Sequence, residues 1–284
     1  MKTILVPTDF SKNADNALEY AIEIAKKEKA NILLLHAFHI TYIYPDVPIQ
    51  YASEEIHEAE EAANKKLKKL CSKVISDGEI TCESICKQGM VVHTILEITK
   101  KKKVDLIVMG TKGASGIKEF LFGSNTARVI EKSKRPVIAV PEKAAFSPIK
   151  NITYASDYES NDIKSLTKLV DIARLFGAKI TVLHVYYKKF SSDEEDKYMN
   201  RFKNKVKSKI QYTKIGYKII YGNSVFEALE KHVQNDSPDL LSMSTHERGI
   251  LDKIFGASLT KAMAYHSKVP LMAFHNKKTS SLLA

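Results

Sequence analysis

The chain has 284 residues, more than one domain of ordinary length usually has, and 44% of them are hydrophobic, enough for two buried cores. Its net charge is +11 at pH 7, but much of the basic excess lies in a lysine-rich segment from Lys197 to Lys218, which has few aromatic side chains. We interpret that segment as a solvated helix face rather than a nucleic-acid surface. No run of about 18 apolar residues occurs, so we expect no transmembrane helix, and we interpret the opening MKTILVPTDF as a strand and not a signal peptide.

The first half of the chain alternates between strand and helix patterns. Ser11 is placed to cap a first helix, because apolar residues recur after it at three- and four-residue spacing. We expect helices there, at Glu54–Ile75, around Val92–Ile98 and up to about Ser133, and buried strands at Thr3–Val6, Ala30–Phe38, Ile80–Lys87, Val104–Met109 and Pro136–Val140. This alternation predicts an α/β domain with a doubly wound parallel sheet, whose ligands bind at the carboxyl ends of the strands. Asp9 and Gly110 fall at two of these ends.

The same pattern begins again in the second half. Asp157 follows an apolar segment as Asp9 does, and His184 stands in an apolar strand as His36 does, both at an interval of 148 residues. The segments DLLSMST and SKVPL likewise match DLIVMGT and SKRPV of the first half. A repeat of this length predicts two domains of one fold. We expect them to cover residues 1–144 and 145–284.

A glycine-rich segment follows the fourth predicted strand. The strand ends at Gly110, and Gly113, Gly116 and Gly123 follow before Ser124 opens the next helix. Glycine allows positive φ and lets a ligand approach the backbone amides, and a helix N-terminus favours an anion. The spacing matches neither the dinucleotide fingerprint GxGxxG nor the P-loop GxxxxGK[ST]. We interpret the segment as a phosphate site, with an ordinary surface loop as the alternative.

The corresponding segment of the second half, SMSTHERGILDKIFGAS, lacks this chemistry. Ser244 stands in the place of Gly110, and Glu247 stands near the place of Gly113. A carboxylate would repel a phosphate, and a Cβ at a position that needs positive φ would add strain. We therefore expect one nucleotide-competent half and one degenerate half.

The chain has three cysteines, Cys71, Cys82 and Cys86. An odd number confined to one region predicts no disulfide framework, so we expect reduced thiols, with Cys71 packed on the buried face of the long helix. Cys82 and Cys86 lack a second pair, or a histidine, at zinc-ligand spacing, and we therefore expect no metal site there.

The segments ILVPTDFS, LLLHAF and GTKGASGIKEFLFGSNTARVI resemble the universal stress protein family, and the last one carries the ATP-binding pattern G-x2-G-x9-G-[ST] of that family. The resemblance covers essentially the whole chain as two UspA-like domains in tandem, and the second half is the weaker match. It implies two five-stranded, Rossmann-like domains of the adenine nucleotide alpha hydrolase type. It also implies ATP with Mg²⁺ as the ligand, a cytoplasmic role in stress responses, and pairing of the two domains through their last strands into an internal pseudo-dimer, with a homodimer as a further step.

The resemblance also carries over a set of nucleotide-binding residues. The strand-end residues would contact the adenosine, Ala37 would meet the adenine, and the glycines with the helix-start residues would hold the phosphates. The set is Pro7, Thr8, Asp9, Ala37, Met109, Gly110, Gly113, Gly123, Ser124, Asn125 and Thr126. The chemistry agrees, because a carboxylate accepts hydrogen bonds from ribose hydroxyls and hydroxyls at a helix start donate to phosphate oxygens.

Each prominent residue also has a purely structural interpretation. Asp9 can serve a turn before the first helix, and Ser124 and Thr126 can be ordinary helix N-terminal residues. The two strand histidines, His36 and His184, are better interpreted as core histidines with a satisfied ring nitrogen than as catalytic bases. For two lysines of the glycine segment the choice between phosphate and solvent stays open: Lys112 and Lys118.

Three functions follow for this chain. The first is a nucleotide-binding stress-response regulator or sensor, because a phosphate loop stands without an evident nucleophile or general base. The second is a slow ATPase or a phosphoryl- or nucleotidyl-transferring enzyme in which Asp9 assists Mg²⁺. The third is a scaffold that binds no nucleotide and works through protein contacts. No Ser–His–Asp arrangement, HExxH or paired-carboxylate motif occurs in the sequence, so at most weak ATP hydrolysis is expected, and neither a membrane nor a nucleic acid is an expected partner.

Overall fold

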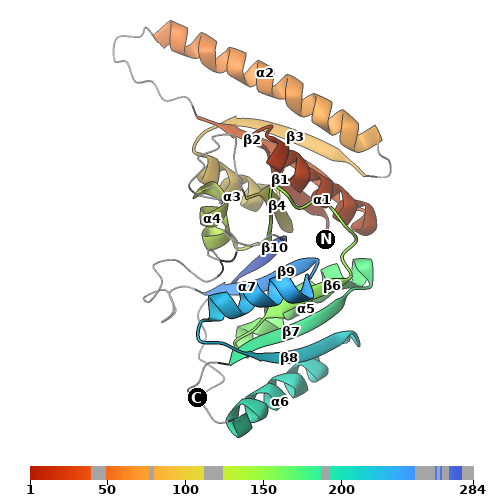
Figure 1. Cartoon of the computed structure of the whole chain (residues 1–284). Coiled ribbons are helices and arrows are strands. Elements are labelled where there is room, and N and C mark those ends of the chain that lie inside the picture. Colours follow the sequence, from red (N-terminus) through yellow and green to blue (C-terminus); the bar gives the residue numbers. More distant parts are fainter. Residues whose placement is uncertain are drawn as a thin grey trace. The chain divides into compact units, whose positions relative to one another are not determined.

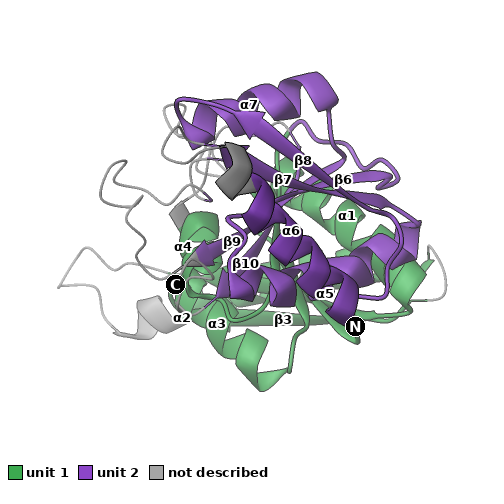
Figure 2. Cartoon of the chain, turned by 90° about the horizontal axis from the view of Figure 1, so that it is seen from below, with its two compact units in different colours: residues 1–142 green, residues 143–284 purple. Residues whose placement is uncertain are grey.

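The computed structural model of the chain describes residues 1–39, 49–76, 80–111, 124–186, 192–246, 260, 263 and 269–276 (Figure 1). The chain divides into two compact units, Met1–Glu142 and Lys143–Ala284 (Figure 2). Each unit is an α/β fold with a parallel sheet, as the alternation of strand and helix patterns predicts.

The first unit orders its strands β3-β2-β1-β4-β5, and neighbouring strands in that order are parallel. The strands are β1 (Thr3–Pro7), β2 (Asn31–Phe38), β3 (Cys82–Gln88), β4 (Leu106–Gly110) and β5 (Val137–Val140). The helices are α1 (Lys12–Glu28), α2 (Ile49–Ser76), α3 (Val91–Lys101) and α4 (Ser124–Lys132). The chain runs outward from β1 to β3 and then returns to β4 on the other side of β1, which is the doubly wound arrangement. Because such crossovers are right-handed, this reversal places α1 and α2 on one face and α3 and α4 on the other (Figure 1).

Helices on both faces explain why the central strands are apolar throughout. Ile4, Leu5 and Val6 of β1 are fully buried, and β4 and β5 are buried along almost their whole length. The predicted cap of α1 is confirmed, because the Ser11 side chain accepts a hydrogen bond from the backbone N–H of Ala14. The long helix begins at Ile49, earlier than the predicted Glu54.

The second unit repeats the plan with the strand order β8-β7-β6-β9-β10, again with parallel neighbours. Its strands are β6 (Asn151–Ala155), β7 (Lys179–Tyr186), β8 (Ile215–Tyr221), β9 (Leu240–His246) and β10 (Leu271–Asn276). The helices in its described ranges include α5 (Ser160–Phe176), α6 (Ser192–Lys209) and α7 (Val225–Asp236). The two-domain repeat read from the sequence therefore corresponds to two copies of one fold.

The first part of the lysine-rich segment lies in α6, a helix with one buried and one solvated face, whereas the segment's last residue, Lys218, lies in β8. Phe202 and Val206 are buried, whereas Arg201 and Lys205 are exposed. This is the amphipathic arrangement of a surface helix, so the interpretation as a solvated face agrees with the structure. Within the described ranges, no helix has the length and apolar character needed to cross a membrane.

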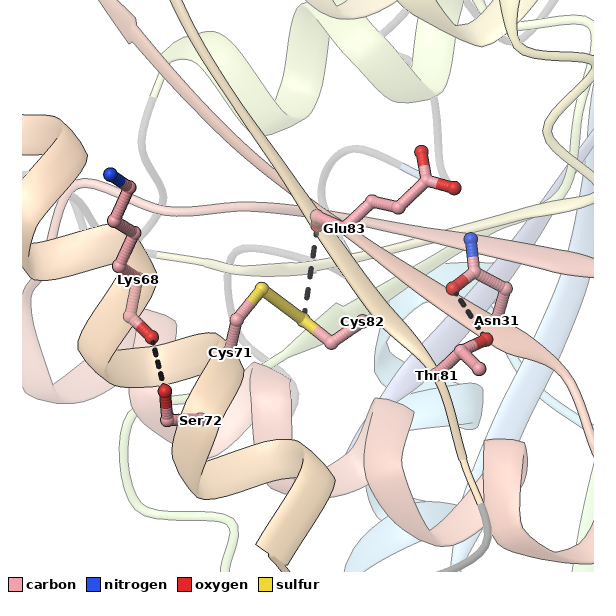
Figure 3. Close-up of a disulfide and its surroundings, with 7 residues drawn as sticks. All are labelled: Asn31, Lys68, Cys71, Ser72, Thr81, Cys82 and Glu83. Carbon is pink, nitrogen blue, oxygen red and sulfur yellow. Dashed lines mark hydrogen bonds between the residues drawn. A yellow bond between two sulfur atoms is a disulfide. The ribbon is translucent and has the colours of Figure 1, made fainter.

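The expectation of reduced thiols is wrong for two of the three cysteines. Cys71 of α2 and Cys82 at the start of β3 form a disulfide, with their Cα atoms 5.4 Å apart (Figure 3). Cys71 is 8% exposed, so its predicted place on the buried face of the helix is confirmed. The sequence could not show the pairing, because the chain reverses between the helix and the strand, and only the fold brings the two Cβ atoms face to face. Cys86 remains a free thiol.

One histidine of the second unit lies in the core. The His232 side chain of α7 is buried, its Nε2 lies 3.0 Å from Thr153 Oγ1, and its Nδ1 lies 3.3 Å from the Asp236 carboxylate. Burial lowers the pKa of His232, the Asp236 carboxylate opposes this shift, and Lys218 adds to it. The folded protein therefore holds this imidazole in its neutral form.

This arrangement predicts that the free energy of unfolding decreases as the pH is lowered below the ordinary histidine pKa of about 6.5. There the unfolded chain binds a proton that the folded protein does not, so the free energy of unfolding decreases. Urea unfolding between about pH 7.5 and about pH 5.5 should show a smaller decrease for His232→Gln than for the wild type. His57→Gln, at an exposed position of α2, is the control and should keep the wild-type pH dependence. Equal pH dependence in His232→Gln and the wild type would contradict the assignment.

Candidate functional site

The carboxyl ends of β1 and β4 form the point where the strand order of the first unit reverses. β1 pairs with β2 on one side and with β4 on the other, in parallel register. Ligands of open α/β sheets bind outside the strand ends at such a switch point, because the loops there diverge to opposite faces. Asp9 follows β1 and Gly110 ends β4, so both predicted residues lie at this edge.

The turn after β1 holds Asp9 in a defined place. The backbone N–H of Thr8 donates to the Leu35 carbonyl at 2.8 Å, which continues the β1–β2 ladder by one residue. The Thr8 hydroxyl accepts from the N–H of Phe10 at 3.0 Å, and Asp9 Oδ1 accepts from the N–H of Ser11 at 3.0 Å. The structural interpretation of Asp9 therefore holds in part, since its carboxylate stabilises the turn before α1. Asp9 is half-buried.

His36 fixes the same turn from the neighbouring strand. Its Nδ1 lies 2.8 Å from the Thr8 carbonyl oxygen, and its ring packs against Phe10 at 4.5 Å between centroids. A carbonyl only accepts, so Nδ1 carries the proton. The expected satisfied ring nitrogen is confirmed, but His36 is half-buried and not a core residue. Phe10 has φ of 63°, in the left-handed region that is strained for a side chain of this size.

Gly110 is needed for the close approach of α1. A Cβ at this position would lie 2.7 Å from Asn13 Nδ2 and 2.9 Å from the Asn13 carbonyl oxygen. Gly110 does not have a positive φ, so the expectation that the position needs glycine for a left-handed backbone is wrong. Steric contact with the buried Asn13 is the reason.

Thr126 connects α4 to the end of β4. Its hydroxyl donates to the Gly110 carbonyl at 2.7 Å, and its side chain is buried. The hydroxyl proton is therefore directed to the protein backbone. Asn125, one residue earlier, is exposed, and Ser124 begins the helix with a side chain outside the described residues.

The remaining predicted residues divide into those that the structure places and those that it does not describe. Pro7 ends β1, Ala37 lies half-buried near the end of β2, and Met109 is buried in β4. Five of the residues that the sequence analysis discusses lie outside the described ranges: Lys112, Gly113, Lys118 and Gly123 of the first unit and Glu247 of the second.

The second unit keeps the turn geometry of the first. Nδ1 of His184 lies 2.8 Å from the Ser156 carbonyl oxygen, and Tyr158 stacks on His184 with a φ of 58°. Thr260 donates to the Ser244 carbonyl at 3.5 Å, as Thr126 does to Gly110. The two strand ends therefore correspond residue by residue.

The second unit fills its own switch point with side chains. Ser244, which replaces Gly110, lies with its Oγ 2.9 Å from Tyr154 Oη and 2.9 Å from Ser165 Oγ. Asn276 of β10 donates to both serine hydroxyls, at 2.8 Å to Ser165 and 3.0 Å to Ser244. This hydrogen-bonded group joins β6, β9, β10 and α5 where a ligand of the first unit would meet glycine and backbone.

A buried carboxyl group continues this network beneath the turn. Asp162 accepts from the Tyr154 hydroxyl at 2.9 Å, from the Ser156 hydroxyl at 2.7 Å and from the backbone N–H of Asp157 at 3.1 Å. Burial first, and then the Asp162 charge, raise the pKa of Tyr154 well above its ordinary value, so the phenol stays protonated and donates. Our sequence reasoning missed Tyr154, Asp162 and Asn276. A tyrosine in the middle of an apolar strand and the capping-box residues Glu159 and Asp162 were the available signals.

Within the described ranges, no group of three or more histidine, cysteine, aspartate or glutamate side chains is placed to hold a metal ion.

Comparison with known proteins gives a consistent result for both halves. The Universal stress protein family model matches residues 1–141 and again residues 148–275. Universal stress protein MJ0531 of Methanocaldococcus jannaschii is 33% identical over 145 residues, which are 49% of this chain and 81% of that protein. Universal stress protein YxiE of Bacillus subtilis is 31% identical over 144 residues, which are 48% of this chain and 97% of that protein. The crystal structure of a universal stress protein from Archaeoglobus fulgidus matches in fold, with a TM-score of 0.73 at 21% identity over 96% of this chain and 98% of that one.

The contact between Gly110 and Asn13 predicts that Gly110→Ala destabilises the first unit by about 1–3 kcal/mol, because the added methyl group overlaps backbone that cannot rotate away. Urea unfolding measures the loss. Gly216→Ala in β8 is the matched control, since its Cβ would lie 3.5 Å from Lys179 Cε, an ordinary contact. A loss no larger than that of the control would contradict the packing role of Gly110.

The network around Asp162 predicts that Asp162→Ala destabilises the second unit by about 3 kcal/mol, because several buried donors lose their acceptor together. Thermal unfolding followed by circular dichroism measures the change. Asp196→Ala, at an exposed position of α6, should change stability by less than about 1 kcal/mol. Similar losses in both variants would show that the network contributes little.

Proposed function

The chain belongs to the universal stress protein family, and we propose that it binds ATP in its first unit and acts as a nucleotide-dependent regulator or sensor in a stress response. One observation carries the proposal. At the switch point of the first unit Gly110 leaves the end of β4 without a side chain, with Asn13 packed against it, whereas Ser244 and its partners Tyr154 and Asn276 form a hydrogen-bonded group at the equivalent edge of the second unit.

The residues proposed to bind the nucleotide surround this edge. Asp9 would accept hydrogen bonds from ribose hydroxyls, and the backbone from Gly110 onward with the N-terminus of α4 would receive the phosphates. The full proposed set is Pro7, Thr8, Asp9, Ala37, Met109, Gly110, Gly113, Gly123, Ser124, Asn125 and Thr126. Since the Thr126 hydroxyl proton is directed to Gly110, its part would be to hold α4 against β4.

The two domains would then differ in nucleotide binding. Residues 1–144 would bind nucleotide, and residues 145–284 would not, because Ser244 and Asn276 occupy the edge with groups that already satisfy one another. We include in the proposal that the two domains pair through their last strands, that the chain forms homodimers, and that the protein works in the cytoplasm.

Magnesium fits the same site, since Asp9 supplies a carboxylate oxygen of the kind that Mg²⁺ prefers. The ion would neutralise phosphate charge. We favour regulation over turnover because the sequence contains no Ser–His–Asp arrangement, HExxH or paired-carboxylate motif. At most weak ATP hydrolysis is proposed.

Binding of Mg-ATP tests this function. Freshly purified protein should release close to one adenine nucleotide per chain on denaturation, or bind one ATP by calorimetry. Asp9→Ala should weaken ATP binding by about ten-fold or more, because a charge-assisted hydrogen bond to the ligand is lost. Asp157→Ala, the same change in the second unit, is the matched control and should leave affinity unchanged.

The outcomes separate the candidate functions. Absence of saturable binding at millimolar Mg-ATP would remove the regulator and leave the scaffold. Two nucleotides per chain, or an equal effect of Asp157→Ala, would overturn the division between the domains. Multiple-turnover phosphate release that disappears in Asp9→Ala would show an ATPase instead.

A further inference from the structure

The Cys71–Cys82 disulfide joins two elements at the margin of the first unit. Cys71 projects from α2 toward Cys82 on β3, and α2 lies alongside this strand (Figures 1 and 3). β3 stands at the end of the strand order of this unit, and among the described strands it pairs with β2 alone. The disulfide is therefore a covalent connection between an edge strand and the helix that covers it.

β3 pairs with β2 along its whole length, and its Glu83 and Lys87 form ion pairs with Lys102 and Glu97 at the surface. None of its residues is fully buried, in contrast to β1 and β4. On either side of Cys71, Leu67 and Val74 of α2 are buried as well. An edge strand with little buried apolar area opens locally more readily than the strands inside the sheet, so one covalent link changes its stability substantially.

The two sulfur atoms differ in accessibility. Cys82 is half-buried at the start of the strand, whereas Cys71 is 8% exposed on the inner face of α2. A small oxidant in solvent therefore meets Cys82 first. Cys71, whose Cα lies 5.4 Å away, is in place to close the bond without a movement of the backbone.

We propose that Cys71 and Cys82 form a reversible redox site, oxidised by a peroxide and reduced by a protein dithiol, that fastens α2 to β3. In the first step the Cys82 thiolate attacks a peroxide oxygen, the O–O bond breaks, and Cys82 becomes a sulfenic acid with release of water or alcohol. The Cys71 thiol then attacks the Cys82 sulfur, the S–S bond forms, and the sulfenic oxygen leaves as water. Reduction passes both electrons from the dithiol through a mixed disulfide and restores two thiols.

The third cysteine is an internal control for this chemistry. Cys86 lies on β3 four residues after Cys82 and therefore on the same face of the strand. Burial first, and then the nearby Glu60 carboxylate, raise the pKa of the Cys86 thiol, so the reactive thiolate is disfavoured there. Cys86 remains free when the other two cysteines are joined.

Thiol trapping on the full chain tests the redox site. Protein reduced with dithiothreitol and freed of it should bind three equivalents of N-ethylmaleimide, whereas protein treated with stoichiometric hydrogen peroxide should bind one, at Cys86. Peptide mapping should show the Cys71–Cys82 cross-link, and thioredoxin should restore all three thiols without denaturant. Hydrogen exchange of the β3 amides should be about thirty-fold slower in the oxidised protein, as expected from the typical effect of one disulfide.

Two variants make the test specific. Cys86→Ser should keep the Cys71–Cys82 cross-link and the difference in exchange, and Cys71→Ser should lose both, because its oxidation stops at the Cys82 sulfenic acid. Reduced wild-type protein provides the open state even if Cys71→Ser folds poorly. A cross-link to Cys86, no cross-link in natively folded reduced protein, a bond that thioredoxin opens only in denaturant, or equal β3 exchange in both states would each overturn the proposal. None of these measurements depends on nucleotide binding.

Discussion

A single hydrogen bond between neighbouring strands determines the geometry of the candidate site. In each unit a histidine of the second strand holds the carbonyl at the end of the first, His36 with Thr8 and His184 with Ser156, both at 2.8 Å. The bond stabilises a turn in which a large aromatic residue, Phe10 or Tyr158, adopts a left-handed backbone conformation. That conformation costs free energy, which the ring stacking and the hydrogen bonds offset. Because the turn directly follows the strand, it sets where Asp9 and Asp157 stand.

The two units differ in what meets this fixed turn from the other side. Gly110 lets Asn13 of α1 approach the end of β4, whereas Ser244 supplies a hydroxyl that Tyr154 and Asn276 bind. A buried hydroxyl group needs hydrogen-bond partners, so a serine in the place of the glycine requires the other polar side chains around it. The difference between the two strand ends therefore involves several residues together and not one substitution alone.

The sequence predicts what depends on local pattern and misses what depends on long-range contact. Strand apolarity and helix periodicity place Asp9 and Gly110 at strand ends, because these patterns lie within short segments of the sequence. The 148-residue interval reveals the repeat, because similar segments recur in the same order. The reason for Gly110 was mistaken, since only the structure shows Asn13 against it. The Cys71–Cys82 pair was missed for the same reason: eleven residues separate the cysteines, but the reversal between them decides whether they meet.

The helix that follows the second strand connects the redox pair to the turn in the first unit. Lys66 of α2 places its Nζ 5.2 Å from the centre of the Phe10 ring, and Cys71 follows about 7.5 Å farther along the helix axis. In the second unit Phe202 of α6 packs on Tyr158 at 5.2 Å, an apolar contact buried with the helix face. A lysine over an aromatic ring is a weaker attachment than buried aromatic packing, because the cation also interacts with water. The helix of the first unit therefore contacts its turn through a cation–π pair, and the helix of the second unit contacts its turn through an aromatic pair with Phe202 buried.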